Sequence, residues 1–342
     1  MIDSAVDTAV TAPEAPVELV IVDVGHGNTT IVRDGPDAVM IDCSRSGAVY
    51  DELLRTDTRR LRHLVISHSD CDHMRGAARL IALGIRADVI SANADSAKDT
   101  VAWEDFRVRV QEEVEAGRSR LAGVYSGNAH ELATRRVIFE VVHPDAGLAL
   151  LGPTSGPAKR TRQMTQNDCS AVLRVVANGK PLALLAGDLT QKGFDRVRRR
   201  AVNMEAPVLV FPHHGGRSGS DDVRFARQLC EMVRPDYVVF SHGRHSGHGT
   251  PRPDIIAGIR GYSKSVRVLC TQLSLRCHSS SAIPLPRHLA LRPAEGASSR
   301  SCCAGTVVFH FDAAGSLVGT PNPADHRGYV STVANALCWA PR

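Results

Sequence analysis

The sequence predicts an α/β fold in which short buried strands alternate with helices. Apolar runs of strand length recur along the chain, and several are followed by segments with helical spacing of apolar residues. The turns "DGPD" and "NGK" each separate two apolar runs, which is typical of hairpins. Clusters of histidine and aspartate follow five of the runs directly, at the strand ends where functional groups gather in such sheets.

The first predicted elements lie between residues 17 and 55. Apolar runs at Val17–Val24, Thr29–Arg33 and Ala38–Asp42 predict a strand followed by a hairpin and a further strand. A helix is expected over Gly47–Arg55. The segment "LRHLVISHSD" then predicts a buried strand, and "MRGAARLIALGI" continues at helical period.

Later elements repeat this design. Residues 96–118 are charged and helix-prone, with Trp103 and Phe106 as anchors, so we expect a helical insertion over residues 96–135. The strand in "RRVIFEVVHPD" ends at His143, and "CSAVLRVVANGKPLALLAGDL" is a hairpin with Asp188 just beyond its second strand. "APVLVFPHHGG" and "PDYVVFSHGRHSGHGTPRPD" are again strands that end in histidines.

Length and composition indicate one large globular domain. The chain has 342 residues, of which 43% are hydrophobic, enough for a sizeable core. We predict a disordered lead-in over residues 1–16, a main domain over residues 17–270, and an extension over residues 271–342 that completes the sheet and ends in a partly disordered tail. The net charge of +5 permits a polyanionic substrate without requiring one.

No feature of the sequence indicates a membrane. Apolar runs stay well below the roughly 18 residues that span a bilayer, and "MIDSAVDTAVTAPEAP" lacks the basic start and apolar middle of a signal peptide. The chain has nine cysteines, an odd number, and Cys71 lies within the histidine–aspartate cluster. We therefore expect a cytoplasmic protein without a disulfide framework.

The segment "HSDCDH" is the strongest candidate for a metal site. His68 and Asp70 alternate at the end of a predicted strand, so their side chains can point the same way. Asp72 and His73 lie on the following turn and could reach a second ion nearby. Imidazole and carboxylate together suit zinc, manganese or iron. The alternative is a solvated polar turn in which an aspartate caps the next helix.

These motifs resemble a known family. "HSDCDH" is similar to the HxHxDH signature of the metallo-β-lactamase superfamily, with aspartate in place of the second histidine. Together with "VDVGHGNTTIV", "VMIDCS", "NDCSAVLRV", "LLAGDL" and "PHHGG", it resembles the C-terminal hydrolase domain of the ComEC DNA-uptake proteins and its free-standing relatives. The chain departs from that family at His26 and Asn28, where glutamine and aspartate are usual. The resemblance implies an αββα sandwich of two mixed β-sheets flanked by helices.

The resemblance also implies two divalent ions, Zn²⁺ or Mn²⁺, and their ligands. His68 and Asp70 would hold one ion, Asp72 and His73 would hold the other, and Asp188 would bridge them. His213 or His214 would complete the ligand set of the second ion. Adjacent side chains point to opposite sides of an extended chain, so we expect only one of these two to be a ligand, with His214 preferred.

The third ligand of the first ion is left open by the sequence. His143 is preferred, and Asp168 or water are the alternatives. Asp42 is expected to orient a ligand histidine from behind. Asp23 is either a similar carboxylate or a plain cap at the end of a strand.

The candidate catalytic residues are Asp72, His213 and His248. A histidine near a dinuclear centre could donate a proton to the leaving group or bind the phosphate of a substrate. His248 is flanked by glycines, so the alternative is an ordinary surface loop. His242 and Ser218 are weaker candidates of the same kind.

The C-terminal cysteines raise a separate possibility. Cys270, Cys277, Cys302 and Cys303 could form a structural zinc site, although their spacing differs from the CxxC pairs of zinc ribbons. The preferred interpretation is that they are small buried residues in two neighbouring strands, "VRVLCT" and "GTVVFHF".

The resemblance favours a metal-dependent phosphodiesterase or nuclease that acts on DNA. Nucleic acid would then be the substrate, and Arg160 and Arg162 of a basic loop could contact its backbone. One alternative is hydrolysis of a small phosphoester or another small molecule. A second alternative is a non-catalytic, metal-stabilised module with protein partners in a multi-component system. The sequence does not indicate DNA uptake by this chain alone.

Overall fold

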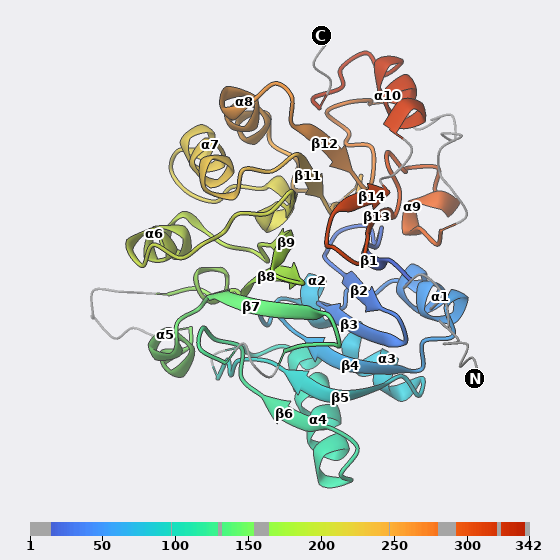
Figure 1. The fold of residues 1–342 in the computed structure, drawn as a ribbon, viewed down its shortest axis with the longest axis vertical. Coiled ribbons are helices and arrows are strands. Elements are labelled where there is room, and N and C mark those ends of the chain that lie inside the picture. The colour runs from blue at the N-terminus through green and yellow to red at the C-terminus, as the bar shows by residue number, and fades with distance from the viewer. Residues whose placement is uncertain are drawn as a thin grey trace, which may run out of the picture.

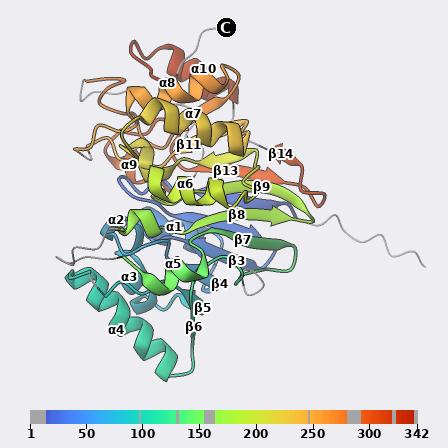
Figure 2. The ribbon, with the colours of Figure 1, turned by 90° about the vertical axis from the view of Figure 1, so that its left-hand side faces the viewer.

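The computed structural model describes residues 15–96, 98–128, 132–153, 164–245, 247–279, 292–319 and 323–338. Two β-sheets pack face to face, and helices cover the outer face of each sheet (Figures 1 and 2). The predicted αββα sandwich is therefore confirmed.

The first sheet has eight strands among the described residues, in the order β14-β13-β1-β2-β3-β4-β5-β6. From β14 to β3 neighbouring strands are antiparallel, and from β3 to β6 they are parallel. The strands are β1 (Val17–Ile21), β2 (Thr30–Asp34), β3 (Asp37–Ile41), β4 (Arg60–Val65), β5 (Arg86–Ser91), β6 (Arg120–Ala122), β13 (Val307–Phe311) and β14 (Leu317–Gly319).

The second sheet has six strands in the described part of the chain, in the order β12-β11-β10-β9-β8-β7. From β7 to β9 the strands are antiparallel, and from β9 to β12 they are parallel. The strands are β7 (Val137–His143), β8 (Val172–Ala177), β9 (Lys180–Leu185), β10 (Val208–Val210), β11 (Tyr237–Phe240) and β12 (Arg267–Cys270).

Helices pack on both outer faces, where capping residues fix their starts. Ser46 begins α1 by accepting a hydrogen bond from the amide of Ala48, and α1 covers the same residues as the predicted helix. Thr100 and Asp221 cap α4 and α7 in the same way. The helices are α1 (Gly47–Arg55), α2 (Cys71–Met74), α3 (Ala77–Ala82), α4 (Val101–Glu115), α5 (Ala146–Leu151), α6 (Gln191–Arg199), α7 (Asp222–Val233), α8 (Pro253–Tyr262), α9 (Glu295–Ser298) and α10 (Pro323–Ser331).

Apolar side chains form a core on each side of both sheets. Phe139 and Phe309 belong to the layer between the sheets. Phe225, which belongs to α7, packs in the layer between the second sheet and the helices α6, α7 and α8. Leu53 and Trp103 pack between the first sheet and its covering helices. Burial of apolar surface in three layers therefore holds both sheets rigidly, and the loops at their edge have a fixed support.

The segment after Cys270 returns to the first sheet, where β13 pairs with β1 and β14 forms the edge. The two strands that were expected to be neighbours, "VRVLCT" and "GTVVFHF", therefore lie in different sheets, and that expectation was wrong. The residues between them still meet, because the amide of Cys303 donates to the carbonyl oxygen of Thr271. Helix α10 packs beside the second sheet through Val330, and Val333, just beyond the end of the helix, joins the same core.

Two other regions bear on the predicted organisation of the chain. Residues 96–135 contain α4 and also β6, which extends the first sheet beyond β5. Residues 1–14 and the loop with Arg160 and Arg162 lie outside the described residues. The proposed division at residue 270 stays a prediction. In the described part of the chain, no helix combines the length and the apolar composition that a bilayer span requires.

Candidate metal centre

The candidate site lies where loops from both sheets converge at the carboxyl ends of strands. Asp42 follows β3, and His68 lies in the loop after β4 of the same sheet. Asp188, His214 and Ser241 come after β9, β10 and β11 of the second sheet. Parallel strands place these loops at one edge, so residues far apart in the sequence meet there.

Six side chains form two groups that could each hold a metal ion. His68, His73 and Asp188 are all buried, and we call them the inner group. His26, Asp72 and His214 form the outer group, in which His26 and Asp72 are partly exposed. Within each group, one ligand atom of every residue lies within 4.8 Å of the others.

Asp188 connects the two groups. Its Oδ1 atom is 3.1 Å from Nε2 of His73 and 3.7 Å from Nε2 of His214. Its Oδ2 atom is 3.8 Å from Nε2 of His68. Nε2 of His73 and Nε2 of His214 are 3.2 Å apart. One carboxylate therefore faces imidazoles of both groups, as a bridging ligand would.

The outer group is arranged around Asp72. Its Oδ2 atom is 3.3 Å from Nε2 of His26 and 3.2 Å from Nε2 of His214. The side chains of His26 and Asp72 are each 27% exposed, whereas that of His214 is 6% exposed. The outer group therefore forms the solvent-facing side of the centre.

Hydrogen bonds behind the rings turn the Nε2 atoms inward. Nδ1 of His73 lies 2.6 Å from Oδ2 of Asp42, which is the role predicted for Asp42. Nδ1 of His214 donates to the carbonyl oxygen of Ser241 at 2.7 Å. Both contacts fix the ring and direct Nε2 toward the centre, the arrangement found behind metal-bound histidines.

The backbone is strained at three positions around the centre. Asp42, His213 and His214 have φ angles of 58°, 53° and 55°, in the left-handed region. Each such residue costs about 1–2 kcal/mol relative to ordinary backbone. The amide and hydroxyl of Ser67 both donate to Asp42, at 2.7 and 2.9 Å, and hold its carboxylate toward His73. The fold therefore sustains strain in order to orient these side chains.

The same φ angles correct one prediction. Residues 212–215 form a tight turn, so His213 and His214 do not alternate along an extended chain as expected. Both rings reach the centre: Nδ1 of His213 is 3.0 Å from Oδ2 of Asp188, while His214 belongs to the outer group.

Electrostatics concentrate negative charge at the centre. Burial would raise the pKa of Asp188, yet His73 and His214 hold it well below its ordinary value. Burial opposes a charged His73, yet Asp188 and Asp42 raise its pKa well above the usual value. Burial lowers the pKa of His26 to about 4, so that ring is neutral at pH 7. Ionised carboxylates beside available imidazole nitrogens attract a cation.

The donor set fits a divalent metal ion. Each group offers two imidazole nitrogens and one carboxylate, which suit zinc, manganese and iron. Nε2 of His68 is buried, and no described residue gives it a hydrogen bond. A cation placed among these atoms would satisfy that nitrogen and the buried carboxylate of Asp188.

The structure groups the motif residues differently from the resemblance. His73 joins His68 in the inner group because Asp42 turns its ring that way. Asp70 belongs to neither group. Its Oδ2 atom is 3.4 Å from Nε2 of His68, and its Oδ1 atom contacts Nζ of Lys98. Burial would raise the pKa of Asp70, but His68 and Lys98 hold it at about 2.

Neither candidate for the third ligand joins the groups. Nε2 of His143 faces the main-chain oxygen of Asp168 at 2.9 Å, which orders the turn before β8. The carboxylate of Asp168 accepts hydrogen bonds from the amide of Thr165 and the hydroxyl of Thr190. In this structure both residues support the loop before β8, and neither belongs to the inner or the outer group.

Two other histidines named as candidates, His248 and His242, lie near the outer group. His248 is exposed and stacks on His26, with ring centroids 4.7 Å apart and an interplanar angle of 22°. His242 is fully buried, and burial lowers its pKa to about 4. The amide of Ser218 donates to Asp222, so this serine begins the approach to α7 and belongs to neither metal group.

His26 is the functional candidate that the sequence did not identify as a ligand. Gly27 has a φ of 132°, and a Cβ there would lie 2.3 Å from the main-chain oxygen of Asp72. The amide of Asn28 donates to that same oxygen at 3.1 Å. The glycine-flanked loop is thus pinned to the metal motif and carries His26 to Asp72. A histidine between glycines at a strand end was the available signal.

Asp23 and the cysteines do not form a further metal group in the part of the chain that is described. Asp23 accepts hydrogen bonds from Gly25, Gln272 and Gly296, and from the thiol of Cys302. It therefore ties the C-terminal segment to β1. Burial raises the pKa of Cys302, and no disulfide joins any described cysteines.

Comparisons with known proteins give a family match and a relative. The family model described as the metallo-beta-lactamase superfamily matches residues 22–242. Competence protein ComA of Neisseria gonorrhoeae is 25% identical to this chain over 278 residues, which are 77% of this chain and 32% of that protein. This chain thus spans about a third of the length of that relative.

Solved structures are similar to this chain at low sequence identity. YhfI of Bacillus subtilis, a metallo-beta-lactamase fold protein, has a TM-score of 0.46 and 14% identity, covering 75% of this chain and 96% of that one. Igni18, a metallo hydrolase of Ignicoccus hospitalis, has a TM-score of 0.46 and 16% identity, covering 87% of this chain and 100% of that one.

Proposed function

This chain belongs to the metallo-beta-lactamase superfamily, and from this premise we propose that it hydrolyses phosphodiesters, with DNA as its substrate, at a centre of two divalent ions. The observation that carries the proposal is the contact between the inner and outer groups. Asp188 faces both groups, and His73 and His214 approach each other to 3.2 Å. This geometry supports two adjacent cation positions that share one carboxylate.

The inner and outer groups would have different roles in such a centre. Bound divalent ions would supply Lewis acidity, which activates water near neutral pH and offsets charge on phosphate oxygens. The inner group is buried and would hold its ion firmly, whereas Asp72 and His26 open toward solvent and the substrate. His213 and His248 lie on that open side, where an imidazole could contact a phosphate or supply a proton to the leaving oxygen.

The choice of DNA rests on the sequence motifs and on the relative's name. The motifs resemble the hydrolase domain of DNA-uptake proteins, and the relative from Neisseria gonorrhoeae is a competence protein. The net charge of +5 is compatible with a polyanion. We place the reaction in the cytoplasm, where thiols stay reduced.

The test is cleavage by protein stripped of metal and then reloaded with Mn²⁺ or Zn²⁺. The substrates are end-labelled single- and double-stranded DNA and the small diester bis(4-nitrophenyl) phosphate. We expect metal-dependent cleavage that Asp72→Ala abolishes. Asp195→Asn is the matched control, because Asp195 lies on α6 and pairs with Gln191 and Arg198 at the surface.

Each contrary result has a definite meaning. Hydrolysis of the small diester or of nucleotides, without any cleavage of DNA, would overturn the choice of substrate and favour a small phosphoester. If the protein holds its ions but cleaves none of these substrates, the proposal that it is a hydrolase is wrong. A metal-stabilised interaction module would then be favoured.

A further inference from the structure

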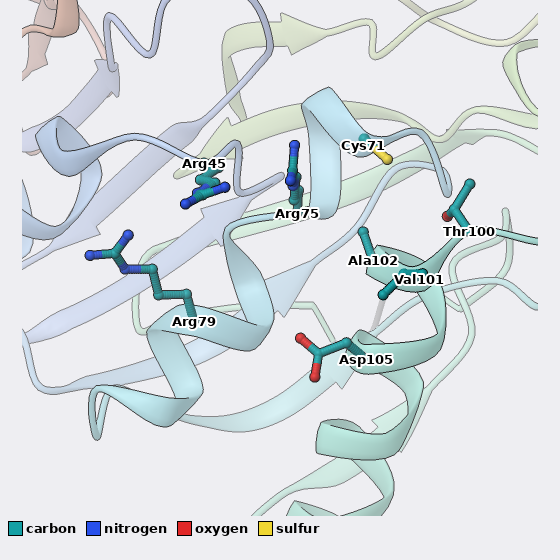
Figure 3. A pocket seen from close by; sticks show the side chains of 8 residues that line it. All are labelled: Arg45, Cys71, Arg75, Arg79, Thr100, Val101, Ala102 and Asp105. Atoms are coloured by element: carbon teal, nitrogen blue, oxygen red, sulfur yellow. The ribbon is translucent and has the colours of Figure 1, made fainter.

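A groove lined by arginines lies beside the metal motif. It has a volume of about 620 Å³ and runs between α2, the start of α3 and the start of α4. Figure 3 shows the arginines on one side and the beginning of α4 on the other. The lining residues are Arg45, Cys71, Arg75, Arg79, Thr100, Val101, Ala102 and Asp105.

The three arginines of the groove have no acidic partner within the described structure. Arg45, Arg75 and Arg79 are exposed, and no described carboxylate or carbonyl accepts a bond from their guanidinium groups. By contrast, Arg33 is bonded to Glu52 inside the fold. Asp105 is the one acid in the lining, and it faces Arg109 at 3.9 Å. The groove therefore carries excess positive charge that the fold does not use.

The fold brings these arginines together through the backbone of the metal motif. The amide of Cys43 donates to the carbonyl oxygen of His73, and the amide of Gly76 donates back to Cys43. A Cβ at Gly76 would lie 2.4 Å from the main-chain oxygen of Ser44, so only glycine permits this approach. The loop that carries Arg45 is thereby held against the segment that carries Arg75 and Arg79, despite the repulsion between like charges.

The wall of the groove includes a residue of the metal motif itself. Cys71 in its wall lies between Asp70 and Asp72 in the sequence. Lys98 contacts Asp70 and precedes Thr100, which lines the groove. Because Cys71 is the neighbour of Asp72, a strand with one phosphate at the outer group would have its next phosphates on the side of the motif where these guanidinium groups lie.

We propose that Arg45, Arg75 and Arg79 bind the phosphates of a polynucleotide strand that flank the scissile bond. Guanidinium groups match phosphate oxygens in charge and geometry. A mononucleotide has no phosphates beyond the reacting one, so the groove serves a polymeric substrate. This inference rests on the proposed function and deepens it by naming the residues that would hold the substrate strand.

The test compares a polymer with a small diester in the same protein preparation. The triple variant R45Q/R75Q/R79Q removes the charges from exposed side chains and should fold normally, which circular dichroism checks. We expect its ratio of kcat/KM on a 20-nucleotide single strand to that on bis(4-nitrophenyl) phosphate to fall roughly 10- to 100-fold at 0.1 M salt. The control Arg199→Gln, at the exposed end of α6, should keep the wild-type ratio.

Binding separates this inference from the proposed function. Fluorescence anisotropy with a labelled single strand, in EDTA, measures binding to the groove in the absence of catalysis. We expect the slope of log Kd against log salt to fall by about 2 in the triple variant, from three phosphate contacts at about 0.7 each. An unchanged slope and ratio would overturn the inference, even if DNA is cleaved. Wild-type binding with the expected slope, but no hydrolysis, would overturn the proposed function alone.

Discussion

The inner and outer groups have the same donors but different surroundings. Each has two imidazoles and one carboxylate. In the inner group every side chain is buried, and Asp42 and Ser67 lock the rings from behind. In the outer group His26 and Asp72 are partly exposed, and His26 is carried by a glycine-flanked loop.

The difference shows how burial can give two positions with the same donors different affinities for an ion and different access for a substrate. A buried, hydrogen-bonded ligand set is preorganised and excludes water, so it binds an ion tightly. A partly exposed set leaves room for a substrate to approach. We expect the inner position to be the tighter one and the outer position to be the one that exchanges its ion.

The largest effect is expected from Asp188→Asn, because this carboxylate faces both groups. The amide cannot supply the bridging charge, so both positions should lose their ions and hydrolysis should fall below detection. Metal content after gel filtration, measured by mass spectrometry, checks the result beside the control Asp195→Asn. Full metal content in Asp188→Asn would contradict the claim that the two groups share Asp188 as a ligand.

His26→Gln should affect the outer position alone. Asp72 and His214 would remain there without the third donor, so affinity should fall by about 10- to 100-fold, as for a disturbed ligand shell. Calorimetric titration of metal-free protein should show one unchanged and one weakened site. The control is His248→Gln, because His248 stacks on His26 without belonging to the group. Two unchanged sites in His26→Gln would remove His26 from the centre.

Asp42→Asn provides the matching change at the inner group. The contact of 2.6 Å with Nδ1 of His73 would lose its charge, and inner-site affinity should fall by about 10-fold or more. The outer site should keep its affinity. A change confined to the outer site would reverse the assignment of His73 to the inner group.

Proton release should also distinguish the groups. In metal-free protein, Asp188 and Asp42 raise the pKa of His73 well above its ordinary value against burial, which favours the protonated ring, whereas burial lowers the pKa of His26 to about 4. A bound ion must displace the proton of His73. Calorimetry in buffers of different ionisation enthalpy should show more protons released by the tighter site, with affinity that rises as pH increases.

The sign of the linked stability follows from the same shifts. A raised pKa means that His73 stabilises the metal-free fold below its ordinary value of 6.5, and this contribution is lost as pH rises through the folded value. Asp188, whose pKa is lowered, contributes above its ordinary value of 3.8 and loses that contribution as pH falls through the folded value. A melting temperature of EDTA-treated protein that rises steadily above pH 8 would contradict this.

The smallest effect is expected from Ser67→Ala. Its hydroxyl donates to Asp42 and lies 3.0 Å from Nδ1 of His68, but its amide would still hold Asp42 at 2.7 Å. We expect a loss of about 1 kcal/mol in the free energy of unfolding and a few-fold loss of inner-site affinity. Urea denaturation with and without Zn²⁺ measures both. A loss as large as that of Asp42→Asn would show that the hydroxyl, not the carboxylate, orients the rings.

Local patterns were sufficient for much of the fold. The apolar runs and the helix over Gly47–Arg55 follow from periodicity and capping, which depend on neighbours in the sequence. The separation of β12 from β13 was missed, because periodicity identifies a strand but not the sheet that it joins. The turn at His213 was missed because left-handed backbone at a histidine has no clear local signal.

By itself, the sequence determined the alternation of strands and helices, the family, and the types of donor at the strand ends. These follow from side-chain chemistry and short-range spacing. The tertiary structure alone decided that His73 faces His68, that Lys98 contacts Asp70, and that His26 reaches Asp72. Those pairings depend on where loops from different strands meet. The contacts that fix them, such as Asn28 to Asp72 and His73 to Asp42, join residues that are remote in the sequence.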